Sequence, residues 1–196
     1  MIKILVASNN LHKINEIKNI LGTKKYKIYS LLDLNIISDP IESGKTFYDN
    51  ALIKALEARK YSDLIIIADD SGLIVPILND EPGIYSKRYA GKNASDDENN
   101  KLLIENIKKF NKNDRHAKFV TTICLLIGNK AYEINGVCEG KIILSGVGNN
   151  GFGYDPIFYV EKYKKTFAQL TEKEKNQISH RGMAIRKLKV ILEELL

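Results

Sequence analysis

Ala68-Asp69-Asp70-Ser71-Gly72-Leu73 follows an uninterrupted run of branched aliphatic residues at 64–67. An apolar run without polar alternation predicts a strand that is buried on both faces, as in a parallel sheet. Two carboxylates then come at the C-terminal end of this strand, where open α/β sheets bind their ligands. Adjacent carboxylates can hold a hard divalent cation, or one can bind the cation while the other activates water. A simple turn is the competing interpretation, because Asp, Ser and Gly favour turns.

Length and composition predict one domain over residues 1–196, with two lobes and no separable linker. The chain is 44% apolar and 28% charged, as is usual for soluble proteins. No apolar run approaches the roughly 20 residues of a membrane span, so we expect no membrane partner. The N-terminal apolar segment is too short for a signal peptide, which favours the cytoplasm. Cys124 and Cys138 lack the spacing of a zinc site and are interpreted as free buried thiols.

The net charge of +6 is compatible with a nucleic-acid partner, a small polyanion or a lysine-rich surface. The lysines are spread along the chain, and no basic cluster is interleaved with aromatic residues. We therefore expect no nucleic-acid partner.

The N-terminal segment predicts a geometry that binds phosphate. Residues 2–7 predict a strand, and Ser8-Asn9-Asn10 supplies N-cap residues for an amphipathic helix with Ile14 and Ile17 on its apolar face. Backbone amides and the positive end of the helix dipole attract phosphate there, and Lys13 lies one turn into the helix. An ordinary capped helix is the alternative.

Gly44-Lys45-Thr46 matches the end of a P-loop, but Asp39 stands where that pattern requires glycine. We reject the P-loop and expect Thr46 to cap a helix that runs to about residue 61. Asn50 and Lys54 lie four residues apart on this helix and can reach one anion together. A solvated polar face is the alternative.

The other segments predict a mixed sheet with flanking helices. Residues 72–78 are strand-like, strands at 119–127 and 131–137 form a hairpin, and a third strand at 140–144 continues the antiparallel arrangement. Capping boxes at 95–98 and 171–174 open helices that end near residues 110 and 178. A final helix begins at residues 179–181, and its buried stripe is expected to be Ile185, Leu188, Ile191, Leu192 and Leu195.

The stretch Gly146-Val147-Gly148-Asn149-Asn150-Gly151 matches the dinucleotide-binding fingerprint. Pro156 and the apolar residues after it predict a loop and a strand where the fingerprint needs a helix, so we reject dinucleotide binding. The glycines give a mobile backbone that presents Phe152 and Tyr154, and an aromatic ring on such a loop can stack on a base. Core packing is the competing use of either ring.

Lys175, His180 and Arg181 place three hydrogen-bond donors around one helix start, where an anion or a carbonyl group could lie. The Ser-His pair at 179–180 is interpreted as a cap, because adjacent helical residues do not face each other as a nucleophile and base must.

These motifs together resemble the inosine triphosphate pyrophosphatase family over nearly the whole chain. Each motif is weak alone, but six in the same order are not expected by chance. The resemblance rests on Ser8-Asn9-Asn10-Leu11-His12-Lys13 with Glu16, Thr46-Phe47 with Asn50-Ala51 and Lys54-Ala55, Ala68-Asp69-Asp70-Ser71-Gly72-Leu73, Pro82-Gly83-Ile84-Tyr85-Ser86, Gly151-Phe152-Gly153-Tyr154-Asp155-Pro156, and Glu174-Lys175 with Ser179-His180-Arg181.

The resemblance implies an α/β fold with a mixed central sheet, two lobes around a long nucleotide-binding cleft, and a homodimer. It implies hydrolysis of noncanonical purine nucleoside triphosphates (ITP, dITP and XTP) to the monophosphate and pyrophosphate, which cleanses the nucleotide pool. It further implies Mg²⁺ held by Glu42 and Asp70, with Asp70 as the proton acceptor beside Asp69. A Maf-like or other nucleotide pyrophosphatase acting on different modified nucleotides is the alternative.

The resemblance also assigns the substrate-binding residues by position. Adjacent strand residues point in opposite directions, so we expect only one of the two aspartates to face the metal, and the resemblance favours Asp70. One departure is Gln169, where the family usually has Glu. The implied substrate-binding residues are Ser8, Asn9, Asn10, Leu11, His12, Lys13 and Lys54 for the phosphates, with Ser71, Phe152, Gly153, Tyr154, Asp155, Lys175, His180 and Arg181 completing the nucleotide pocket.

Overall fold

The structure, a computed structural model, describes residues 1–196 as two compact units. Unit 1 comprises Met1–Asp70, Thr121–Gly136 and His180–Leu196, and unit 2 comprises Ser71–Val120 and Val137–Ser179. The elements are β1 (Ile2–Val6), α1 (Leu11–Leu21), β2 (Tyr26–Ser30), α2 (Phe47–Arg59), β3 (Ile65–Ile74), α3 (Asp96–Ile107), β4 (His116–Ile127), β5 (Lys130–Ile142), β6 (Phe158–Val160), β7 (Lys165–Thr166), α4 (Glu172–Ile178) and α5 (His180–Leu195).

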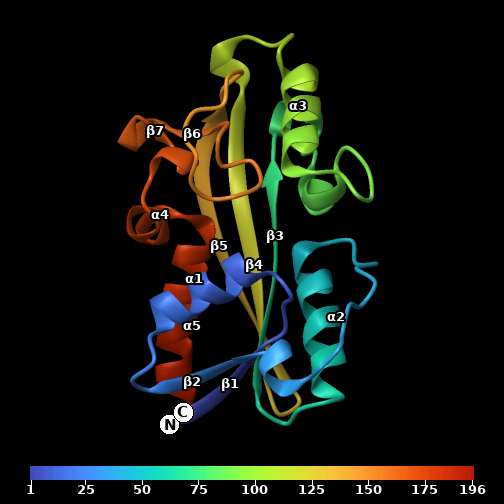
Figure 1. Cartoon of the computed structure of the whole chain (residues 1–196), viewed down its shortest axis with the longest axis vertical. Coiled ribbons are helices and arrows are strands. Elements are labelled where there is room, and N and C mark those ends of the chain that lie inside the picture. Colours follow the sequence, from blue (N-terminus) through green and yellow to red (C-terminus); the bar gives the residue numbers. More distant parts are fainter. The chain divides into compact units, whose positions relative to one another are not determined.

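The strands form one seven-stranded sheet in the order β2-β1-β3-β4-β5-β6-β7 (Figure 1). β1 pairs in parallel with β2 and β3, whereas β6 pairs antiparallel with β5 and β7. The predicted fold class, a mixed α/β sheet with flanking helices, is therefore confirmed. A single domain with two lobes around a cleft stays a prediction. None of the helices has the length and apolar composition needed to cross a membrane.

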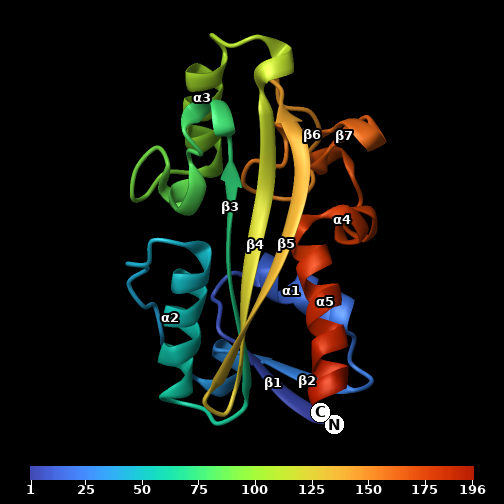
Figure 2. The same cartoon turned by 180° about the vertical axis from the view of Figure 1, so that it is seen from behind.

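The central strands of unit 1 are buried on both faces, as their unbroken apolar runs predict. On β1, Ile4 and Val6 pack into one core cluster while Leu5 packs into another. On β3, Ile67 and Ile66 divide between the same two clusters. α1 and α5 cover the first face and α2 covers the second (Figures 1 and 2). This two-sided burial explains why the run at 64–67 needs no polar alternation.

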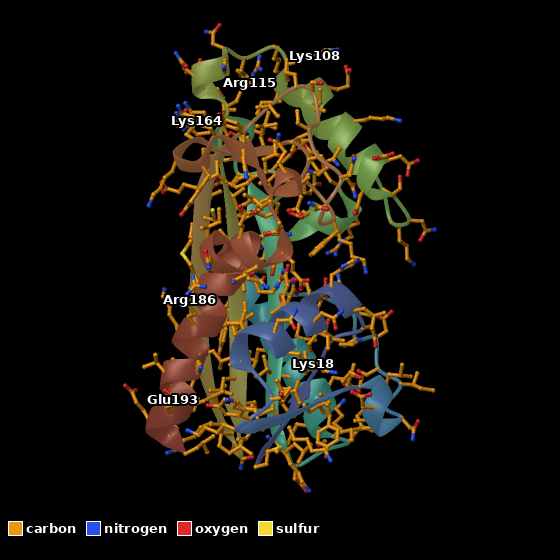
Figure 3. The ribbon with its side chains drawn as sticks, turned by 60° about the vertical axis from the view of Figure 1, so that its left-hand side comes forward. Lys18, Lys108, Arg115, Lys164, Arg186 and Glu193 are labelled. Carbon is orange, nitrogen blue, oxygen red and sulfur yellow. The ribbon has the colours of Figure 1, made fainter.

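The long helix α5 packs beside α1 through one apolar stripe. Ile185, Leu188 and Leu192 are fully buried in it, as predicted, but Leu195 is 43% exposed. The prediction for Leu195 was wrong, because this side chain, in the last turn of α5, lies outside the core cluster that contains Leu188 and Leu192. Arg186 and Glu193 occupy the opposite, exposed side of α5 (Figure 3).

Two predicted strand boundaries were wrong. The acidic pair does not end its strand, since β3 continues to Ile74. β1 nevertheless stops opposite this region, with Val6 paired to Ile67, so Asp69 and Asp70 lie just past the end of the parallel pairing. The separate strand expected at 140–144 is the end of β5, whose alternating burial continues without a turn through Cys138 to Ile142.

Unit 2 has its own aromatic core. The rings of Phe119, Phe158 and Phe167 lie 4.7 to 5.7 Å apart, centroid to centroid. Both predicted capping boxes are present, with Ser95 opening α3 and Thr171 opening α4. The glycine-rich stretch at 146–151 forms a loop without a helix, as the rejection of the dinucleotide fingerprint requires.

Candidate functional site

The loop between β1 and α1 is ordered by its own polar side chains. Asn10 is the N-cap of α1, and its Oδ1 accepts from the amides of His12 at 3.0 Å and Lys13 at 3.3 Å. Ser8 Oγ accepts from the amide of Asn10 at 3.1 Å. Three amides expected to attract phosphate therefore already have side-chain acceptors. The positive charge available to an anion beside this loop comes mainly from Lys13, in the first turn of α1.

Asp69 is held in a buried network of charged side chains in unit 1. Lys13 Nζ lies 2.9 Å from Asp69 Oδ2, and Arg181 Nε lies 3.3 Å from the same oxygen. Arg181 Nη1 also contacts Glu16 Oε2 at 2.5 Å. Burial alone would raise the pKa of Asp69, but the charges of Lys13, Arg181 and Lys54 outweigh it and hold the pKa far below its usual range. Asp69 is therefore a fixed anion.

Asp70 points to different partners, as expected for the next residue of a strand. Asn50 Nδ2 donates to Asp70 Oδ2 at 3.1 Å, and Lys54 Nζ donates to Asp70 Oδ1 at 3.4 Å. This confirms that Asn50 and Lys54 reach one anion together, and the anion is the protein's own carboxylate. Burial raises the pKa of Asp70, and the opposing charges of Lys54 and Lys13 only partly compensate. Asp70 is thus the more basic member of the acidic pair.

Lys54 joins Asp70 to Glu42. Its Nζ lies 3.0 Å from Glu42 Oε1, so two carboxylates converge on one ammonium group. Burial would lower the pKa of Lys54, but Asp70, Asp69 and Glu42 together raise it. Lys13 differs, because burial lowers its pKa more than Asp69 raises it. Lys54 is the more firmly charged of the two lysines.

The donor set of Glu42 and Asp70 fits a hard cation such as Mg²⁺. Mg²⁺ commonly takes one or two carboxylates and completes its octahedron with water and substrate phosphates. No group of three or more His, Cys, Asp or Glu side chains is arranged to hold a metal ion by itself. Glu42 and Asp70 already converge on the positive charge of Lys54. They therefore suit a cation whose remaining ligands come from water and the substrate.

The stretch Gly44-Lys45-Thr46 serves α2 instead of a phosphate. Thr46 forms a capping box with Asp49, and the amide of Gly44 donates to Asn50 Oδ1 at 2.8 Å. A Cβ at position 44 would lie 2.5 Å from Asp49 Cβ, so only glycine fits this approach. The loop thereby orients the amide of Asn50 toward Asp70, and the rejection of a P-loop is supported.

In unit 2, Asp155 organises the loop that carries Phe152. Asp155 Oδ2 accepts from the amide of Phe152 at 2.9 Å and from Lys175 Nζ at 2.5 Å. Lys175 Nζ also lies 4.7 Å from the centre of the Phe152 ring, within cation–π range. Gly151 has φ +79°, and a Cβ there would collide with the Asp155 carboxylate. Phe152 is half-buried on a loop fixed by ionic contacts.

Tyr154 serves the packing of unit 2, the alternative raised for it from the sequence. Its ring is buried, and its hydroxyl donates to the carbonyl of Ser86 at 2.8 Å. Burial raises the pKa of its hydroxyl. Ser71 lies half-buried on β3, and His180 is the buried first residue of α5. Substrate contacts by these residues stay predictions.

The donors expected around one helix start are divided between the units. Lys175 belongs to unit 2 and pairs with Asp155, whereas Arg181 belongs to unit 1 and pairs with Asp69 and Glu16. Sequence spacing alone could not reveal these partners, because the nearest of them is 20 residues away along the chain.

Sequence reasoning missed two polar residues of α3. The acids at 96–98 were attributed to capping, which holds for Glu98, but Asp96 accepts from the amide of Gly153. Asn100 donates to the carbonyl of the same residue. The signal was Asn99-Asn100, two poor helix formers in succession near the start of a helix.

The site lies on a mixed α/β sheet whose strand β3 carries two aspartates, each paired with a lysine from a different helix, and these are the residue types that phosphoryl-transfer sites use. Comparisons with known proteins are more specific. A sequence profile of the Ham1 family matches residues 4–191. The chain belongs to the Ham1 family.

Individual relatives agree over full length. A dITP/XTP pyrophosphatase of Clostridium perfringens is 48% identical over 206 residues, covering 100% of both chains. The structure of a HAM1 protein from Coxiella burnetii superposes with a TM-score of 0.91 at 41% identity, covering 99% of this chain and 100% of the other. The Ham1 protein of Staphylococcus aureus gives a TM-score of 0.87 at 45% identity, covering 98% of each.

Proposed function

We propose that this protein hydrolyses ITP, dITP and XTP to the nucleoside monophosphate and pyrophosphate. The relatives named dITP/XTP pyrophosphatase support the substrate class. They do not favour the Maf-like alternative. The observation that carries the chemistry is the pairing of Asp69 with Lys13 and of Asp70 with Lys54, which brings a lysine from each of two helices to the two aspartates of one strand.

In the proposed reaction the oxygen of a water molecule attacks the α-phosphorus, and the bond from that phosphorus to the bridging oxygen breaks. Asp70 accepts the proton of the attacking water, since Asp69 is already engaged by both Lys13 and Arg181. Lys13 and Lys54 hold the phosphate chain and balance its charge. Asp69 stays ionised and keeps Lys13 in place.

We assign Mg²⁺ to Glu42 and Asp70, the carboxylates that converge on Lys54. When bound, the ion would neutralise charge on the phosphates, as in other phosphoryl-transfer enzymes. Ser8, Asn9, Asn10, Leu11 and His12 would line the phosphate chain, the exposed side chains among them adding contacts at the start of α1.

For the base, we assign stacking to Phe152 and supporting contacts to Asp155 and Lys175. In this proposal His180 donates to the 6-oxo group. Arg181 is given only a supporting role, because its Nε and Nη1 already donate to the carboxylates of Asp69 and Glu16. The 6-amino group of adenine would meet a donor with a donor, and such an unpaired contact can discriminate by up to about 10⁴.

The test is a pyrophosphate-release assay over ITP, dITP, XTP, GTP and ATP, with and without Mg²⁺. We expect pyrophosphate from the first three and kcat/KM for ITP well above that for ATP. Equal kcat/KM for ITP and ATP would refute the base pocket, and release of orthophosphate would assign the protein to the phosphatases instead.

We also propose that the protein works in the cytoplasm as a homodimer, as the family resemblance implies. Light scattering coupled to size-exclusion chromatography is expected to give twice the chain mass of 22.2 kDa. A monomer at micromolar concentration would contradict the assembly.

A further inference from the structure

Two residues near the start of α3 hold the backbone of Gly153 by both of its polar atoms. Asp96 Oδ2 accepts from the Gly153 amide at 2.6 Å, and Asn100 Nδ2 donates to the Gly153 carbonyl at 3.0 Å. Asp96 and Asn100 are four residues apart, so they share one face of the helix. Gly153 has φ +62°, a left-handed conformation that glycine adopts readily. We name these two hydrogen bonds the Gly153 clip.

The bond to Gly153 explains why a polar side chain stands at the buried position of Asn100. It is 9% exposed, and its Oδ1 has no hydrogen-bond partner. A buried amide oxygen without a donor costs free energy that an apolar side chain would avoid. Its neighbour Asn99 is different, because its Oδ1 accepts from the amide of Ala90 and its Nδ2 donates to the carbonyl of Lys87. The gain from Asn100 is therefore its bond to Gly153.

The clip fixes the peptide on the C-terminal side of Phe152. On the other side, the Phe152 amide is held by Asp155, and after Gly153 the hydroxyl of Tyr154 is anchored to Ser86. Phe152 itself is half-buried, and its orientation depends on the backbone around it together with the cation–π contact from Lys175. Loosening Gly153 would remove one of the restraints that hold the ring in this orientation.

We propose that Asp96 and Asn100 are positioning residues that orient the Phe152 ring for stacking on the purine base. This inference rests on the proposed function, because it presumes that Phe152 meets the base. Stacking contributes equally to binding of the ground state and of the transition state, so its loss raises KM and spares kcat. We expect KM for ITP to rise about tenfold when the clip is cut.

The experiment compares Asp96→Ala and Asn100→Leu with the wild type. Asp96→Asn keeps an oxygen acceptor for the Gly153 amide and is the conservative rescue. Asp97→Ala removes the same charge from the same helical turn without touching Gly153, and is the matched control. For each variant we would measure kcat and KM for ITP, inhibition by inorganic tripolyphosphate, and the Kd of inosine monophosphate by calorimetry.

We expect Asp96→Ala and Asn100→Leu to raise KM for ITP and the Kd of inosine monophosphate about tenfold, with kcat within about twofold. Inhibition by tripolyphosphate, which has no base, should not change. Asp96→Asn and Asp97→Ala should match the wild type. In a Phe152→Ala background, Asp96→Ala should add nothing further, because the clip acts through that ring.

Unchanged KM and Kd in both clip variants would overturn the proposal. An equal loss of tripolyphosphate inhibition would also overturn it, since it would show a general disturbance of the fold. If Asn100→Leu does not fold, the exposed Asp96 still decides the question. Wild-type protein that binds inosine monophosphate but releases no pyrophosphate would refute the proposed function alone, because the Kd values still test the clip.

Discussion

Asp69 and Asp70 are neighbours whose surroundings move their pKa values in opposite directions. Alternation along β3 sends Asp69 to Lys13 and Arg181, and sends Asp70 to Asn50 and Lys54. Paired carboxylates with separated pKa values are the usual sign of divided roles in a site. One is suited to be a permanent anion and the other to exchange a proton.

Asp69→Asn should lower the free energy of unfolding by about 3–5 kcal/mol at pH 7, because it leaves the buried Arg181 and Lys13 without their shared carboxylate. The folded-state pKa of Asp69 is depressed. Its stabilisation is therefore fully present above the unfolded pKa of about 3.9 and is lost as the pH falls toward the folded pKa. Urea unfolding of both proteins should show a difference that is constant from pH 7 to about 5 and shrinks below about 4. A difference that grows on acidification would contradict the network.

Asp70→Asn should lower kcat about 10²- to 10⁴-fold, the usual contribution of a positioned general base. Its stability should change little, because relief of the buried charge offsets the weaker contacts with Lys54 and Asn50. Steady-state kinetics, circular dichroism and urea unfolding check the three parts. Asp39→Asn, an exposed acid of the same unit, is the control. Turnover of Asp70→Asn close to wild type would remove Asp70 from the proton-accepting role.

Gln169 shows why one departure from the family pattern is tolerated. Its Oε1 accepts from the amide of Thr166 at 2.9 Å and completes the capping box of a short 3₁₀ helix. An amide oxygen serves this bond as a carboxylate would. The cap therefore needs no charge at this position.

At the scale of single elements, the N-cap residue of α1, Asn10, is also part of the candidate phosphate loop. Asn10→Ala should cost about 1 kcal/mol in unfolding free energy, because two amides lose their acceptor. Asn10→Asp keeps the acceptor and should keep the stability, but it adds negative charge beside the phosphates and should raise KM for ITP. Urea unfolding and steady-state kinetics separate the two effects. Equal KM values for Asn10→Asp and wild type would place the phosphates elsewhere.

The elements that the sequence predicts best are those specified by local contacts. The caps at Asn10, Thr46, Ser95 and Thr171 are all present, since a capping side chain bonds amides two or three residues away. The ends of β3 and β5 could not be predicted in this way. A strand continues as long as a neighbour pairs with it, and the polar residues at 69–71 are tolerated because their partners come from elsewhere in the fold.

At the scale of the whole molecule, the residue types of the site could be predicted but their partners could not. The ion pair between Glu16 and Arg181 joins residues 165 positions apart, and no spacing rule reaches that far. The motif residues could be predicted from the family resemblance. That Lys13 pairs with Asp69 and Lys54 with Asp70 is visible only in the structure.

Removal of divalent metal should abolish pyrophosphate release, and added Mg²⁺ should restore it. Glu42→Gln should raise the Mg²⁺ concentration for half-maximal activity about tenfold, since one of two proposed carboxylate ligands is lost. A Mg²⁺ titration of both proteins after treatment with a chelator measures this. Full activity in the chelator would refute the metal assignment.

The proposed reaction is tested most directly by finding which phosphorus atom the water attacks. ITP is hydrolysed by the enzyme in ¹⁸O-labelled water, and the products are examined by ³¹P NMR and mass spectrometry. Attack at the α-phosphorus predicts that one ¹⁸O atom enters inosine monophosphate and that the pyrophosphate carries none. Label in the pyrophosphate, or release of labelled orthophosphate, would contradict the proposed reaction.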